Sequence, residues 1–129
     1  MATWNDIRQY ARTTYRLSND EPDWFGIIFE VAPGRTQKVV VRAFRAYDRD
    51  WIEFRSAVCK QEELSPVVAL RQNAEMAMGF LALIGERYYV LHNAPLATLD
   101  LDEFRLPLVF LATHADRLER QYSSGNDDF

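Results

Sequence analysis

The fold of this chain is decided by residues 64–122, which read LSPVVALRQNAEMAMGFLALIGERYYVLHNAPLATLDLDEFRLPLVFLATHADRLERQY. The stretch first predicts a short helix, because Ser65 is a good cap and Pro66 then takes the first helical position, which proline favours. Two strands, over 78–84 and 87–92, follow with a tight Gly-containing turn between them. This part of the chain therefore predicts a helix followed by a β-hairpin.

A long amphipathic helix closes the same stretch. Asp100 is its expected cap, and Glu103 three residues later completes a capping box. Over Leu101–Tyr122 the helix would be about 33 Å long. Pro107 lies inside the pattern and removes a backbone hydrogen bond; the helix either kinks there or is divided in two, and we expect the kink. The apolar stripe has four- and three-residue spacing: Phe104, Leu108, Leu111, Ala115, Leu118 and Tyr122.

The first half of the chain predicts one helix and three strands. The helix, over 3–17, begins with a weak capping box, and turn residues 18–22 end it. The strands, over 24–31, 37–47 and 51–58, are joined by short turns and form an antiparallel meander. Because both faces of the first strand are apolar, we expect both faces of the sheet to be covered.

The element order is α-β-β-β-α-β-β-α. This order is typical of an α+β domain in which helices cover an antiparallel sheet. We expect a single domain over residues 1–122 and a disordered tail over 123–129, which is polar apart from its last residue.

Composition excludes several classes of protein. The formal charge of −4 and the sequence pI of about 5.1 argue against a general nucleic-acid or anionic-membrane binder. Cys59 is the only cysteine, so no intrachain disulfide can form, which fits a reducing compartment. Met1–Tyr10 does not resemble a signal peptide, and no apolar run is long enough to span a bilayer. We expect a cytoplasmic protein.

The chain offers no catalytic or metal-binding constellation. Cys59 has no histidine near it in sequence and is interpreted as a buried structural thiol. His92 and His114, the two imidazoles, have no metal-type spacing. We therefore expect no catalytic residues, no metal and no cofactor. A hydrolytic enzyme would require one of these three residues to meet a carboxylate in a pocket.

Cations and aromatic residues alternate on one face of the predicted meander. Aromatic rings can stack on bases while arginine contacts phosphate, so this face could bind nucleic acid or a small ligand. The negative total charge instead favours a sheet face that is covered by the chain itself or that contacts another protein. The residues of this alternative ligand face are Lys38, Arg42, Phe44, Trp51 and Arg55.

Four motifs of the second half resemble a known family. They are the run Val68–Phe80, the strand Tyr88–Leu91, the pair Pro95-Leu96 followed by Leu99-Asp100, and the run Ala112–Glu119. They resemble YbjN-type domains, which belong with the class I type III secretion chaperone-like fold. The resemblance is clearest over residues 64–120. It implies a small, acidic, bacterial cytoplasmic homodimer without a cofactor, which either holds a polypeptide or acts as a sensory regulator.

The leading hypothesis is a non-catalytic, chaperone- or adaptor-like domain that holds a segment of a partner polypeptide. The alternative is a regulator that binds a small ligand or nucleic acid on the Arg and aromatic sheet face. By resemblance, the dimer interface would lie on the helix after Ser65 and the next strand, and would contain Val67, Leu70, Arg71, Ala74 and Phe80. Partner capture would use apolar residues of the first helix and first strand: Trp4, Ile7, Trp24 and Ile28.

Overall fold

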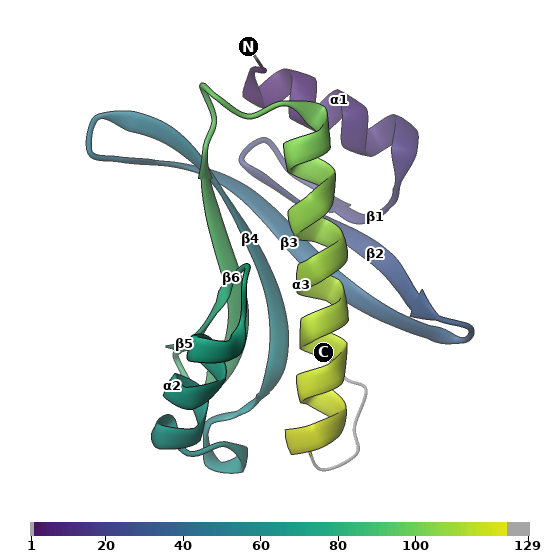
Figure 1. Cartoon of the computed structure of the whole chain (residues 1–129). Coiled ribbons are helices and arrows are strands. Elements are labelled where there is room, and N and C mark those ends of the chain that lie inside the picture. Colours follow the sequence, from purple (N-terminus) through teal and green to yellow (C-terminus); the bar gives the residue numbers. More distant parts are fainter. Residues whose placement is uncertain (1, 124–129) are drawn as a thin grey trace.

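A computed structural model describes residues 2–123, and in this range one six-stranded antiparallel sheet packs against three α-helices (Figure 1). The helices are α1 (Trp4–Thr14), α2 (Pro66–Glu75) and α3 (Leu101–Tyr122), with a 3-10 turn η1 (Gln61–Glu63) before α2. The strands are β1 (Arg16–Asp20), β2 (Trp24–Ala32), β3 (Arg35–Ala46), β4 (Arg49–Lys60), β5 (Phe80–Ile84) and β6 (Arg87–Pro95). The sheet order is β1-β2-β3-β4-β6-β5. The α+β class is confirmed; the expected tail lies outside the described residues from position 124 onward.

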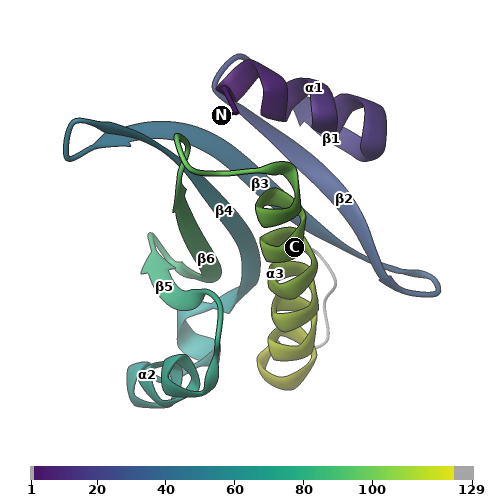
Figure 2. The same ribbon diagram turned by 45° about the horizontal axis from the view of Figure 1, so that its top comes forward.

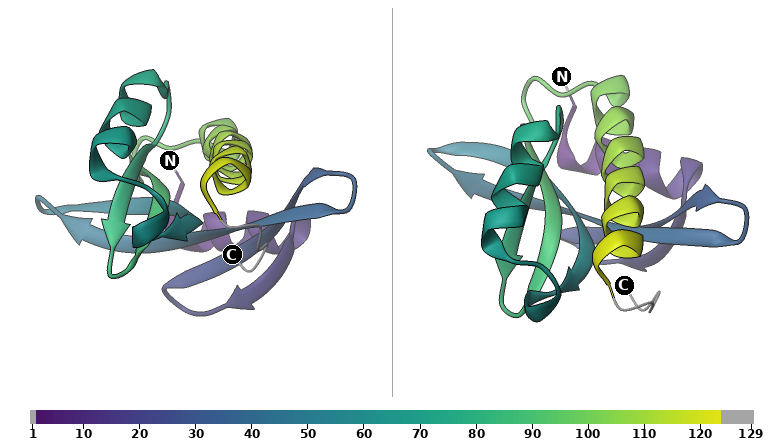
Figure 3. Two further views of the ribbon diagram at one scale, coloured as in Figure 1. Left: turned by 90° about the horizontal axis from the view of Figure 1, so that it is seen from below. Right: turned by 60° about the horizontal axis from the view of Figure 1, so that its bottom comes forward.

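The core lies between the helices and one face of the sheet. Ile7 of α1 is completely buried, and the Phe104 ring of α3 lies 6.4 Å from Phe25 of β2 and 5.4 Å from Phe54 of β4. Figure 3 shows α2 and α3 standing on the same side of the sheet. No helix of the described range covers the opposite side, so the expectation that both faces are covered is wrong.

The strand register shows which side chains occupy the uncovered side. Residues paired directly across neighbouring strands point to the same face. Trp24 pairs with Arg42, Arg42 with Glu53, and Glu53 with Asn93. Each of these four residues lies next to a buried core residue in its own strand. Successive residues of a strand point to opposite faces, so these four side chains face away from the helices. We call the side of the sheet to which these residues belong the open face.

The expected cap residues are present, but the reciprocal bond from the Asp100 backbone N–H to the Glu103 side chain, which would complete the expected capping box of α3, is not found in the described residues. Thr3 and Asp6 form the capping box of α1, the Ser65 side chain accepts from Val68 N, and Asp100 accepts from Glu103 N. The last helix continues through Pro107 as one ribbon (Figure 2), so it is not divided into two helices.

Strand β1 was not expected from the sequence. We expected a helix as far as Leu17 and a turn at Ser18–Pro22, but α1 ends at Thr14 and the next residues pair with β2. Arg12 Nε of α1 then donates to Asp20 Oδ2 over 2.6 Å, and this hydrogen bond lowers the pKa of the Asp20 carboxyl. Backbone pairing and this ion pair hold β1, which has no apolar stripe of its own.

Candidate functional site

The groups that could carry catalysis do not converge. Cys59 is buried, and burial raises the pKa of its thiol to about 11, so the thiol stays protonated at neutral pH. It pairs with Tyr88 on β6, whereas His92 lies four residues further along that strand, about 13 Å away at the usual strand rise. His114 lies on α3, stacked against Phe110. Burial lowers the pKa of both histidines.

Residues 2–123 contain neither a metal-binding cluster nor a membrane-spanning helix. In this range no group of three or more His, Cys, Asp or Glu side chains could hold a metal ion. None of the helices there is both long and apolar enough to cross a membrane. Three acids of the sequence that lie close to other acids have structural roles: Asp48 occupies the β3–β4 turn, Asp50 pairs with Arg45, and Asp100 caps α3.

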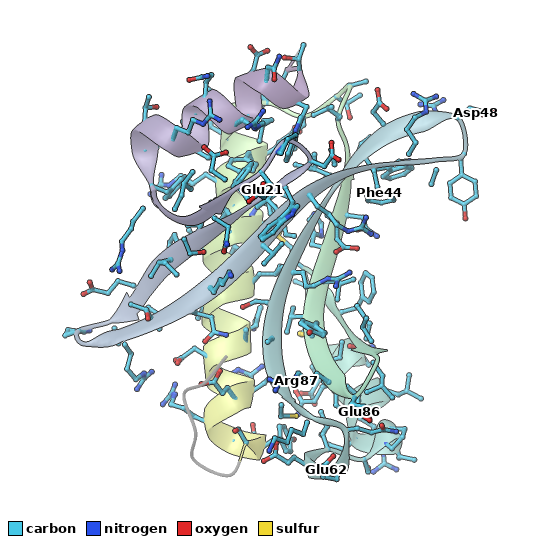
Figure 4. The ribbon with its side chains drawn as sticks, turned by 180° about the vertical axis from the view of Figure 1, so that it is seen from behind. Glu21, Phe44, Asp48, Glu62, Glu86 and Arg87 are labelled. Atoms are coloured by element: carbon cyan, nitrogen blue, oxygen red, sulfur yellow. The ribbon has the colours of Figure 1, made fainter. Side chains whose placement is uncertain are left out.

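The open face brings together residues of two sets for which the sequence predicted different functions, ligand binding and partner binding. It contains the whole alternative ligand face and two of the four expected partner-binding residues, Trp24 and Ile28. Seen from behind in Figure 4, Phe44 lies toward the turn end of the β3–β4 hairpin, two residues before the end of β3. The principal side chains of the open face are Trp24, Ile28, Lys38, Val40, Arg42, Phe44, Trp51, Glu53, Arg55, Phe80, Tyr89 and Leu91.

A carboxylate lies at the centre of this surface. Glu53 is only 5% exposed because two arginines cover it. Arg42 donates from Nε to Oε1 over 3.2 Å and from Nη2 to Oε2 over 3.0 Å. Arg55 donates from Nε to Oε1 over 2.9 Å. Glu53 therefore holds both guanidinium groups flat against the sheet.

Aromatic rings hold the cations of the open face from the other side. The Arg42 guanidinium lies 4.9 Å from the centre of the Phe44 ring, which stacks on Trp51. Arg55 lies 5.3 Å from the centre of the Tyr89 ring. These distances fall in the range of cation–π contacts. The cations are thus positioned before any partner arrives.

The absence of a side chain at Gly26 leaves room for Lys38 to lie across the sheet. The Lys38 Nζ donates to Asn19 Oδ1 over 2.8 Å and lies 6.0 Å from the centre of the Trp24 ring. A Cβ at Gly26 would come within 2.7 Å of Lys38 Cε. A side chain at this position would displace the lysine, so glycine keeps the open face flat there.

The expected partner-binding set does not form one surface. Ile7 is a core residue with no exposed surface, so it cannot contact a partner in this conformation. Trp4 is half-buried on the helix side, where it stacks on Phe25 and donates to the Pro22 carbonyl. The apolar stripe of α1 is therefore mainly core, which the periodicity alone could not distinguish from a binding stripe.

The expected dimer residues also divide between two surfaces. On α2, Val67 is 57% and Leu70 is 69% exposed, and Arg71 and Ala74 are exposed as well. Phe80 is exposed on β5, where it pairs with Leu91 and so belongs to the open face. On both surfaces these apolar side chains, Val67 and Leu70 on α2 and Phe80 on β5, stay exposed in the described part of the chain.

An open hollow of about 730 Å³ adjoins the open face, and sequence patterns did not indicate it. It lies where the β3–β4 hairpin meets the start of α1 and the loop before α3. Trp4, Phe44 and Leu96 are among its apolar lining residues, and Arg45 and Asp50 are among the charged ones. These segments are distant in sequence, so only the tertiary fold could show the hollow.

Comparison with known proteins identifies the fold. No protein-family model matches this chain, and no curated protein matches its sequence. A chain of the HopA1–SchA chaperone–effector complex superposes with a TM-score of 0.64 at 12% identity, covering 88% of this chain and 90% of that chain. A chain of the ExsC–ExsE complex superposes with a TM-score of 0.63 at 16% identity, covering 98% of this chain and 100% of that chain. The chain thus has a chaperone-like α+β fold.

Proposed function

We propose that this chain is a non-catalytic, chaperone- or adaptor-like domain that holds a segment of a partner polypeptide and acts as a homodimer. The observation that carries the proposal is the uncovered open face, whose ordered aromatic and apolar side chains meet no other element of residues 2–123. Exposed apolar patches of this kind are typical of interaction surfaces. The fold shared with a chaperone–effector complex supports this function.

The dimer would form through α2. Its outward side chains Val67 and Leu70 are the exposed aliphatic residues of this helix, with Arg71 and Ala74 beside them. A two-fold interface uses one patch twice, so a single apolar helix face can supply both sides. We place the dimer in the bacterial cytoplasm, because the resemblance to YbjN-type and secretion-chaperone domains points there and Cys59 is the only thiol.

Sedimentation velocity tests the dimer directly. The parent chain should sediment as a dimer, and Leu70→Glu should give a folded monomer, because a charge would be buried unpaired at the interface. Leu101→Glu is the matched control: Leu101 is also exposed, but it lies at the start of α3. A parent chain that stays monomeric at high micromolar concentration contradicts the proposal.

The second candidate is a YbjN-type regulator that binds a small ligand or nucleic acid on the open face. The arginines and stacked rings of that face favour it. Nucleic-acid binding would weaken steeply as salt rises, because phosphate contacts release counterions. An affinity for RNA or DNA that is flat across salt concentrations excludes phosphate contact.

A further inference from the structure

We propose that the open face binds a polypeptide segment in which carboxylate side chains lie among apolar ones. This inference rests on the proposed function, since it names the chemistry of the partner that the domain would hold. It follows from the charge, the remaining hydrogen-bond donors and the apolar side chains of the face.

The open face differs in charge from the rest of the molecule. By the strand register, β1 to β4 place six cations on it, Arg16, Lys38, Arg42, Arg49, Arg55 and Lys60, against two anions, Glu30 and Glu53. The chain as a whole has a net charge of −4. The face is therefore a basic area on an acidic protein, and complementary charge selects an acidic partner.

Donors remain on this face after the internal ion pairs are made. Glu53 uses Nε and Nη2 of Arg42 and Nε of Arg55, while Arg42 Nη1 and both Nη atoms of Arg55 have no hydrogen-bond partner within residues 2–123. Both guanidinium groups are partly exposed. A guanidinium binds a carboxylate well through two donors, and here the rings of Phe44 and Tyr89 already restrict its motion.

The same face suits a polypeptide better than a nucleic acid. Apolar side chains such as Ile28, Val40 and the exposed Phe80 lie on the same face as the cations and would meet no phosphate. An extended polypeptide places side chains on one side about 6.8 Å apart, which is also the spacing along each strand of the face. Acidic and apolar side chains can therefore alternate against it.

Fluorescence anisotropy with three labelled probes tests the proposal. The probes are a synthetic peptide of alternating Glu and Leu, the same peptide with Lys in place of Glu, and oligouridine. The parent chain should bind the Glu peptide most tightly. The variant Arg42→Gln/Glu53→Gln/Arg55→Gln removes both cations together with the carboxylate that they cover, so no charge is left buried alone. It should bind the Glu peptide at least about tenfold more weakly.

Two single variants serve as controls. Glu53→Gln should bind the Glu peptide more tightly than the parent chain, because it removes the carboxylate that competes for both arginines. Arg105→Gln, which removes an exposed arginine of α3, should leave the affinity unchanged. A change in tryptophan emission locates the site: it should persist in Trp4→Phe and disappear in Trp24→Phe/Trp51→Phe.

Four results overturn the proposal: equal affinity of the triple variant, preference for the Lys peptide, tighter binding of oligouridine, or conversion of a dimeric parent chain into a monomer by the triple variant. The last would make the open face the interface between copies. None of these results contradicts the proposed function if the parent chain is dimeric and binds a polypeptide on another surface. A monomeric chain that holds no polypeptide contradicts the proposed function itself.

Discussion

Asp116 on α3 accepts a hydrogen bond from Arg35 at the start of β3, and this ion pair connects the last helix to the β2–β3 hairpin. Asp116 is buried, and Arg120 one turn later lies 3.3 Å from the same carboxylate oxygen. The second half of α3 is thereby fixed over β3, on the side of the sheet opposite the open face.

Removing this carboxylate should destabilise the fold. Asp116→Ala leaves the Arg35 guanidinium without its partner, and we expect the free energy of unfolding to fall by about 1–3 kcal/mol; the partial exposure of Arg35 limits the loss. Urea denaturation measures it. Asp23→Ala, at an exposed position before β2, is the matched control and should cost far less. Equal losses for the two variants would show that the Arg35–Asp116 pair contributes nothing.

Gly79 is required where the chain enters β5. Its φ is +85°, and an added Cβ would lie 3.1 Å from the Leu91 carbonyl oxygen and 3.3 Å from Leu111 Cδ1. Gly79→Ala should therefore cost about 2 kcal/mol or more, through both backbone strain and crowding. Gly34→Ala is the control: its φ is +76° but nothing lies within 4 Å of the added Cβ, so only the backbone cost of about 1 kcal/mol applies. Thermal or urea unfolding measures the loss of stability in both variants. A larger loss for Gly34→Ala than for Gly79→Ala refutes this explanation.

Stability should decline in mild acid because of the two histidines. Burial lowers the pKa of His92 and His114 from the ordinary value of 6.5, and Arg117 lowers that of His114 further. Below pH 6.5 the unfolded chain takes up protons before the folded chain does, so the free energy of unfolding falls as pH falls through this range. Urea titrations at several pH values above and below 6.5 should show the decline, and His92→Gln/His114→Gln should reduce it. A parent chain whose stability does not change across this range contradicts the assignment.

Cys59 should be unreactive in the folded protein. Its thiol is buried and its pKa is raised to about 11, so little thiolate exists near pH 8. Iodoacetamide labelling followed by intact-mass measurement should show almost no adduct in the native chain and complete modification after unfolding in urea. Rapid labelling of the native chain would indicate an accessible, activated thiol.

Local sequence signals predicted most of the helices and strands. Helix caps and apolar stripes are formed by residues close together in sequence, so they depend little on contacts with distant parts of the chain. The caps Thr3, Ser65 and Asp100 lie where their side chains satisfy free backbone N–H groups. Five of the six residues in the long stripe of α3 are buried as its spacing indicated, and Tyr122 at its end is half-buried. By contrast, β1 has the polar sequence RLSND and is held by pairing with β2, so no periodicity could reveal it.

The candidate site was less predictable because it depends on which side of the sheet the helices occupy. Both faces of β2 are apolar, so alternation could not show that Phe25 faces the core while Trp24 faces outward. The apolar periodicity of α1 likewise suggested Ile7 as a binding residue, but Ile7 is fully buried as part of the core cluster. The Arg and aromatic residues were recognised from sequence, while their contacts with Glu53 required the register of β3 with β4.

The most direct test of the account is the composition of the complex that this chain forms in its own cell. A tagged copy, purified at physiological salt and measured by sedimentation with mass spectrometry of its components, should be found in a complex that contains two copies of the chain together with bound polypeptide. Leu70→Glu should disrupt the pairing of the copies. A single copy, free of any bound polypeptide and still monomeric at high micromolar concentration, would contradict the account.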